Sequence, residues 1–125
     1  MTSVDDILKA PRLHKSFRER AKEAAALKEQ ERWAQIEKDC DNLEADVEGW
    51  LVSLNLTSEE LWRIKLVRGL WGNYHGMLTW TIDDLPFRAF YSQFPDGRTE
   101  LIIDVSTAPG VFRQVKDLAD VGAAL

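Results

Sequence analysis

A chain of 125 residues, 45% apolar and 30% charged, has the size and composition of one soluble globular domain. Its single cysteine excludes an intrachain disulfide, and the lack of a long apolar run predicts a cytoplasmic protein without signal peptide or membrane contact. The net charge of −5 is unevenly distributed, since residues 9–32 hold eight Lys/Arg against four Glu and residues 37–60 hold eight Asp/Glu against one Lys. This segregation points to partners rather than to a particular fold.

The first part of the chain is predicted to be helical. Ser3, followed by two aspartates, marks the start of a short helix that Pro11 ends. From about residue 15 to residue 54 strong helix formers dominate, without a proline. The apolar positions before and after residues 28–32 do not share one register. We therefore expect either a helix broken near 28–32 or a basic arm, residues 1–32, that extends past the domain.

One side of the segment from residue 33 to residue 54 forms an unbroken apolar stripe. Steps of three and four land on Trp33, Ile36, Cys40, Leu43, Val47, Trp50 and Leu54. We expect this stripe to pack on a sheet, because a parallel coiled coil would bring like charges together at its e and g positions. An antiparallel pairing of two chains would instead bring the basic arm of one beside the acidic segment of the other.

Thr57 and Glu60 form a capping-box pattern that starts a second helix. The apolar positions of this helix continue to Leu70 or Trp71. The alternation of apolar and basic residues over 62–66 would also fit a strand, but the capping box favours the helix. Glycines at positions 69, 72 and 76 indicate that a loop follows.

From residue 77 onward the apolar period becomes two, which predicts an antiparallel meander. The expected strands are Met77–Ile82, Phe87–Phe94 and Thr99–Val105, joined by turns at Asp83-Asp84 and Pro95-Asp96-Gly97. After a turn at 108–110, residues 111–115 would form either a fourth strand or the opening of a helix. Asp117 is expected to cap a short terminal helix.

These elements define an α+β fold in which N-terminal helices pack on a C-terminal antiparallel meander of three or four strands. We expect a single domain over residues 1–125. Its parts are the helical basic arm 1–32, the helices 33–72, the antiparallel sheet 76–116 and the short terminal helix 117–125.

Two charged surfaces are candidate partner-binding sites. On the acidic helix the carboxylates of one line are Glu37, Asp41, Glu44 and Glu48. Such a row is either a solvated face or an imitation of a phosphate backbone that occupies a basic groove on another protein. On the basic arm the candidates are Arg12, Lys15, Phe17, Arg18, Lys22 and Lys28. The interspersed glutamates pair with these cations and disfavour nucleic-acid binding, which is kept as a further alternative.

A third candidate is the glycine-flanked loop with Trp71, Tyr74 and His75, because polar and aromatic loop residues can form a ligand site. Cys40 occupies the apolar stripe, where its thiol would be buried and unreactive. Neither histidine follows the Glu-x-x-His spacing of a helical di-metal site, and no nucleophile or phosphate-loop motif is present. We therefore expect no enzyme, no catalytic residue, no metal and no cofactor.

The charge segregation and the helical arm together predict a small non-enzymatic protein with a regulatory or protein–protein interaction role. It would dimerise, or dock on another protein, through its N-terminal helical region. The main alternative is an inhibitor whose acidic helix occupies the basic nucleic-acid-binding groove of a partner protein.

Overall fold

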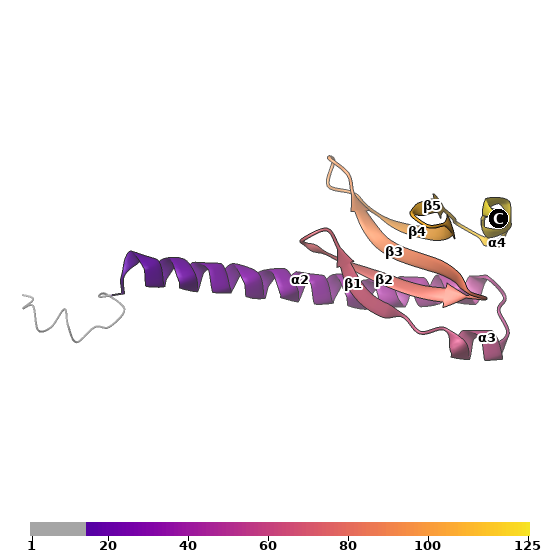
Figure 1. The fold of residues 1–125 in the computed structure, drawn as a ribbon, viewed down its shortest axis with the longest axis horizontal. Helices are drawn as coiled ribbons and strands as arrows, with labels where there is room; N and C mark the ends of the chain where they lie inside the picture. The colour runs from indigo at the N-terminus through magenta and orange to yellow at the C-terminus, as the bar shows by residue number, and fades with distance from the viewer. Residues whose placement is uncertain (1–14) are drawn as a thin grey trace, which may run out of the picture. The chain divides into compact units, whose positions relative to one another are not determined.

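The computed structural model describes residues 15–125. The short helix predicted before Pro11 and the arm residue Arg12 lie outside the described residues. The chain divides into two units, Met1–Trp33 and Ala34–Leu125. Helix α2 (Phe17–Ser53) contributes residues to both units, and every other described element belongs to the second (Figure 1).

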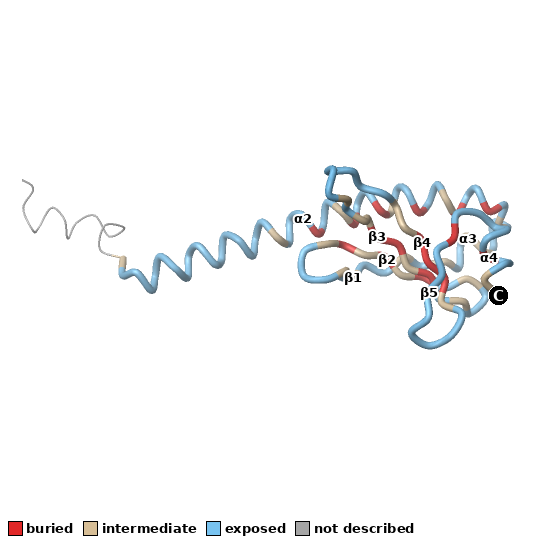
Figure 2. Tube along the Cα trace, turned by 90° about the horizontal axis from the view of Figure 1, so that it is seen from above, coloured by how far each residue is buried: buried red, intermediate tan, exposed pale blue. Residues whose placement is uncertain are grey.

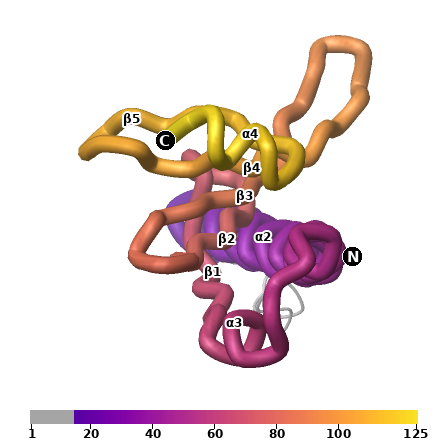
Figure 3. Tube along the Cα trace, turned by 90° about the vertical axis from the view of Figure 1, so that its right-hand side faces the viewer, coloured from indigo at the N-terminus to yellow at the C-terminus, as the bar shows by residue number. Residues whose placement is uncertain are grey.

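The second unit contains a five-stranded antiparallel sheet with strand order β1-β2-β3-β4-β5. Its elements are α3 (Ser58–Arg63), β1 (Val67–Trp71), β2 (His75–Ile82), β3 (Leu85–Gln93), β4 (Thr99–Ala108), β5 (Val111–Gln114) and α4 (Leu118–Ala124). Each strand pairs with the next one along the chain (Figure 3), which confirms the predicted meander and the α+β class. The sheet has five strands, where three or four were expected.

Helix α2 runs without a break through residues 28–32, although the change of apolar register there allowed one. Side-chain hydrogen bonds span this stretch, because Glu29 accepts from Arg32 Nε at 3.2 Å and from the indole Nε1 of Trp33 at 2.8 Å. Pairs three and four residues apart stabilise a helix, and the stretch contains neither proline nor glycine. Trp33 is 45% exposed, so the first position of the predicted stripe does not join the core.

The rest of the stripe packs against one face of the sheet and forms the core of the second unit. Its buried residues are Ile36, Cys40, Leu43, Val47 and Leu54 as predicted, with Leu51 in addition, while Trp50 is half-buried. On the sheet the core residues are Leu78, Trp80, Phe87, Ala89, Ile103 and Val105. Figure 2 shows buried positions on this part of α2 and on the strands beside it. Each fully buried Leu or Val contributes about 1.5–3 kcal/mol, which makes the stripe the main attachment of helix to sheet.

The capping box at Thr57 is confirmed, since Thr57 and Glu60 exchange side-chain-to-backbone hydrogen bonds of 3.1 Å. The prediction that this helix continues to Leu70 or Trp71 is wrong, because α3 ends at Arg63 and residues 67–71 form strand β1. A capping box determines where a helix begins, whereas pairing with β2 holds the later backbone extended. The predicted glycine loop is accordingly limited to residues 72–74.

The predicted turns separate the strands of the meander. Asp83 and Asp84 have positive φ angles of 48° and 66°, as the tight two-residue hairpin between β2 and β3 requires. Residues 111–114 form a strand rather than the opening of a helix. Asp117 caps α4 as predicted, and Trp50 ties this end of the chain to α2 by donating to the carbonyl of Lys116 at 2.7 Å.

Helix and sheet approach one another closely at Gly76 of β2. A Cβ atom at this position would lie 2.7 Å from Cys40 Sγ and 2.9 Å from the carbonyl oxygen of Ile36. Unbonded heavy atoms prefer separations near 3.5–4.0 Å, and the helix backbone cannot rotate away as a side chain can. The contact therefore needs a residue without a side chain.

Replacement of Gly76 by alanine is expected to lower the free energy of unfolding by about 1–3 kcal/mol, the usual range for overpacking. The matched control is Gly69→Ala on β1, where the nearest atom would be Met77 Cε at 3.6 Å, an ordinary contact. This control should be neutral or slightly stabilising, because glycine weakens a strand. Urea denaturation measures both, and equal free energies of unfolding for the two variants would refute the close-approach argument.

Candidate functional site

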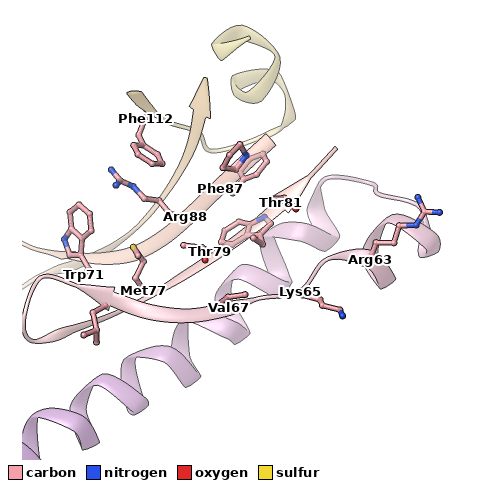
Figure 4. A pocket seen from close by; sticks show the side chains of 13 residues that line it. Arg63, Lys65, Val67, Trp71, Met77, Thr79, Thr81, Phe87, Arg88 and Phe112 are labelled. Atoms are coloured by element: carbon pink, nitrogen blue, oxygen red, sulfur yellow. The ribbon is translucent and has the colours of Figure 1, made fainter. Parts of the chain in front are cut away.

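The face of the sheet opposite α2 carries a different set of side chains. Successive residues of a strand point to opposite faces, so the positions that alternate with the core residues lie on this outer face. An open groove of about 740 Å³ lies there (Figure 4), and we call it the outer groove. Its lining includes Arg63, Lys65, Val67, Trp71, Met77, Thr79, Thr81, Arg88 and Phe112. A volume of this size is typical of small-ligand sites.

At one end of the outer groove, Arg88 lies between Trp71 and Phe112 (Figure 4). Its Nε donates to Asp104 Oδ2 at 3.0 Å, and Asp104 is only 6% exposed. The guanidinium lies 3.6 Å from the ring centroid of Phe112 and 4.8 Å from that of Trp71. Trp71 in turn stacks on Phe90 with ring centroids 4.1 Å apart. A buried carboxylate and three rings thus hold a planar cation in a defined position.

Arg63 and Lys65 supply positive charge at the other end of the outer groove (Figure 4). Arg63 pairs with Glu59 on its own helix, while Lys65 makes no ion pair with any residue from 15 to 125. The hydroxyl groups of Thr79 and Thr81 lie between the two ends. None of the lining residues is acidic, so the groove offers hydrogen-bond donors and positive charge.

The predicted acidic row of α2 is not a uniform line of free carboxylates. Arg68 of β1 donates to Glu44 Oε1 at 2.8 Å and to Asp41 Oδ1 at 2.7 Å. The hydrogen bond to Glu44, followed by that to Asp41, raises the pKa of Arg68. Glu37 and Glu48 are exposed and make no ion pair within the described part of the chain. A cation of the sheet neutralises the middle of the row, which weakens the idea that the row imitates a phosphate backbone.

In the basic arm all residues from 16 to 31 are exposed, and those from Phe17 onward belong to helix α2. Two large apolar side chains lie among them, Phe17 at 79% and Leu27 at 57% exposure. Lys15 pairs with Glu23, as the interspersed glutamates predict. Lys15 is partly exposed, and the other candidate cations within the described arm are exposed: Arg18, Lys22 and Lys28.

Of the three residues of the predicted loop site, Trp71 and His75 are register partners across the β1–β2 hairpin, but their side chains have different neighbours. Trp71 lines the outer groove, Tyr74 is exposed in the β1–β2 hairpin, and His75 lies beside Asp39 of α2 with Nδ1 3.9 Å from Oδ2. That separation is too long for a hydrogen bond. Within residues 15–125, no group of three or more His, Cys, Asp or Glu side chains is arranged to hold a metal ion.

Most residues that line the outer groove could not be predicted from the sequence. The Arg63–Lys65 pair, Arg88 and Phe112 come from three separate stretches of the chain, and strand pairing together with the α3–β1 connection places them along one groove. One signal was present, because Thr79 and Arg88 alternate with core residues and face each other across the β2–β3 hairpin. Among the predicted site residues that the structure describes, Trp71 alone lines the groove.

Comparisons with known proteins add no relative: no protein-family model matches the chain, and no curated protein or solved structure is significantly similar to it. Helix α2 has the length to cross a bilayer but is too rich in charge, and no other helix in the described range qualifies as a membrane span. The function is therefore inferred from the geometry.

Cys40 lies beneath the helix–sheet contact and is 1% exposed. Burial raises the pKa of its thiol, and the charge of Arg68 only partly offsets that effect. The thiolate is the reactive form of cysteine, so little of the nucleophile exists at neutral pH.

Cys40 should not react with the thiol reagent DTNB while the protein is folded, and it should react completely in concentrated urea. A Val52→Cys variant is the positive control, because Val52 is exposed on the same helix. Its added thiol should react within the mixing time under native conditions. Rapid labelling of Cys40 in the folded wild-type protein would contradict the buried position.

Proposed function

We propose that this protein is a small non-enzymatic interaction protein that self-associates through its N-terminal helical arm. The observation that carries the proposal is the exposure of every residue from 16 to 31, about four turns of α2. Helices owe most of their stability to packing of an apolar face, and a short helix in water is marginal without it. Phe17 and Leu27 supply apolar surface for a partner to cover. The inert position of Cys40 supports a non-enzymatic role.

Charge favours a second copy of the same chain as the partner. Residues 9–32 hold eight Lys/Arg and four Glu, and residues 37–60 hold eight Asp/Glu and one Lys. In an antiparallel dimer the basic arm of one copy lies beside the acidic segment of the other, where Glu37 and Glu48 are exposed. Because a two-fold axis relates the two copies, each contact between arm and acidic segment occurs twice in the dimer, and both contribute to its stability.

The other partners have less support. Arg68 already engages Asp41 and Glu44, which leaves a shorter acidic surface for imitation of a nucleic acid. Nucleic-acid binding by the arm is opposed by its four glutamates, one of which pairs with Lys15. Self-association accounts for both the apolar and the charged residues of the arm.

The full chain should have twice the chain mass of 14.3 kDa in light scattering after size exclusion. Replacement of both Phe17 and Leu27 by glutamine, a good helix former, should give the monomer mass with unchanged helix content by circular dichroism. The control is Val52→Gln, which alters an exposed apolar residue of the same helix outside the arm and should remain dimeric.

Charge provides a second readout of the same proposal. A Lys22→Glu, Lys28→Glu double variant should dissociate at lower protein concentration than the wild type, and added salt should weaken the wild-type dimer. A full chain that stays monomeric at high concentration, or a double glutamine variant that keeps the dimer mass, would rule out the arm as the interface.

A further inference from the structure

The outer groove has the charge of an anion-binding surface although the chain as a whole is acidic. Three cations line it and no carboxylate does, against a net charge of −5 for the protein. Two of the cations are partly balanced, since Arg88 contacts Asp104 and Arg63 contacts Glu59. Lys65 has no such partner from residue 15 to the end of the chain. The charge of Lys65 is thus available to a ligand.

The end of the groove opposite Lys65 presents the flat faces of aromatic rings. The rings of Trp71 and Phe112 line it, and the guanidinium of Arg88 lies against both. Phe90 backs Trp71 at 4.1 Å in a parallel stack and the buried Asp104 holds Arg88, so the arrangement exists before any ligand arrives. Aromatic rings and a planar guanidinium are the groups on which flat heterocycles stack.

Between these ends the groove is polar enough to hold a linking group. Thr79 and Thr81 contribute hydroxyl groups. These two hydroxyl groups lie in an otherwise largely apolar stretch of the lining and can form hydrogen bonds with the oxygen atoms of a linking group.

We infer that the outer groove binds a nucleotide, with the base stacked at the Trp71–Phe112 end and the phosphate at the Lys65–Arg63 end. The chemistry of a flat ring joined through a hydroxylated sugar to an anion matches the order of the groups in the groove. An acidic peptide would pair with the cations, but its carboxylate side chains have no flat ring to stack on Trp71 and Phe112. The groove's volume of about 740 Å³ accommodates a ligand of this size. The nucleotide is either free or part of a single strand, and the two share this recognition.

Two probes test the inference on the full chain. Fluorescein-labelled oligothymidylate is followed by fluorescence anisotropy, and adenosine monophosphate is used both in calorimetry and as an unlabelled competitor. Saturable binding of either probe is expected, with competition by the mononucleotide if the free ligand is recognised. Binding of the oligonucleotide alone would assign the groove to single strands and would equally support the inference.

Matched variants locate the binding. Lys65→Glu should weaken binding by about tenfold or more, the effect of losing a hydrogen bond to a charged group. Phe112→Leu should weaken it by about fivefold or more, through loss of a stacking face. The controls are Arg98→Glu and Phe94→Leu, because Arg98 also lies over an aromatic ring and beside an aspartate but outside the groove. Both controls should retain wild-type affinity, and urea denaturation checks that all four variants are folded.

Three results would overturn the inference: no saturable binding of either probe, equal losses in the groove variants and their controls, or displacement of the labelled probe by polyglutamate as effectively as by nucleotide. The last result would mean that the groove recognises charge without a ring. If the probes bound to the basic arm instead, the Lys65→Glu and Phe112→Leu variants would keep wild-type affinity. That outcome would be a case of the second result and would overturn the inference.

Discussion

The close contact between α2 and the sheet at Gly76 is the constraint on which the second unit depends. A helix backbone can approach a strand this closely only where the strand lacks a side chain, and the approach brings Leu43 and Val47 into the core. The stripe of α2 then commits one face of the sheet to the interior. An antiparallel sheet packed on one side can expose the other, and the outer groove lies on that second face.

The two faces differ in charge as well as in burial. On the helix side the carboxylates Asp41 and Glu44 meet the cation Arg68. Three cations and no carboxylate line the outer groove, although Asp104 and Glu59 partly balance Arg88 and Arg63. The protein is acidic overall and still has a basic groove, because the sheet separates the acidic residues of α2 from the groove cations. The proposed self-association uses the arm and the acidic segment, and the proposed nucleotide site uses the outer groove. These surfaces share no residue.

Much of the fold could be predicted because its signals are local. The spacing of apolar residues indicated the stripe and the strands, and capping residues located the starts of α3 and α4 at Thr57 and Asp117. The prediction was wrong for residues 64–71, which were expected to continue the helix, although a strand pattern competed with it over 62–66. The strand forms at residues 67–71, where pairing with β2 holds the backbone extended, and no pattern within the segment reveals its partner. Of the predicted site residues that the structure describes, only Trp71 lines the outer groove, because the other lining residues meet through long-range pairing.

By itself the sequence determined the spacing of the apolar residues, where the helices start and how charge is distributed along the chain. These properties depend on single residues and on spacings of a few positions. Only the tertiary structure decided that Arg68 crosses to Glu44, 24 residues away, and that Arg88 lies between Trp71 and Phe112. Such contacts depend on strand register and on which face a helix covers, and both are settled by the packing of the whole core.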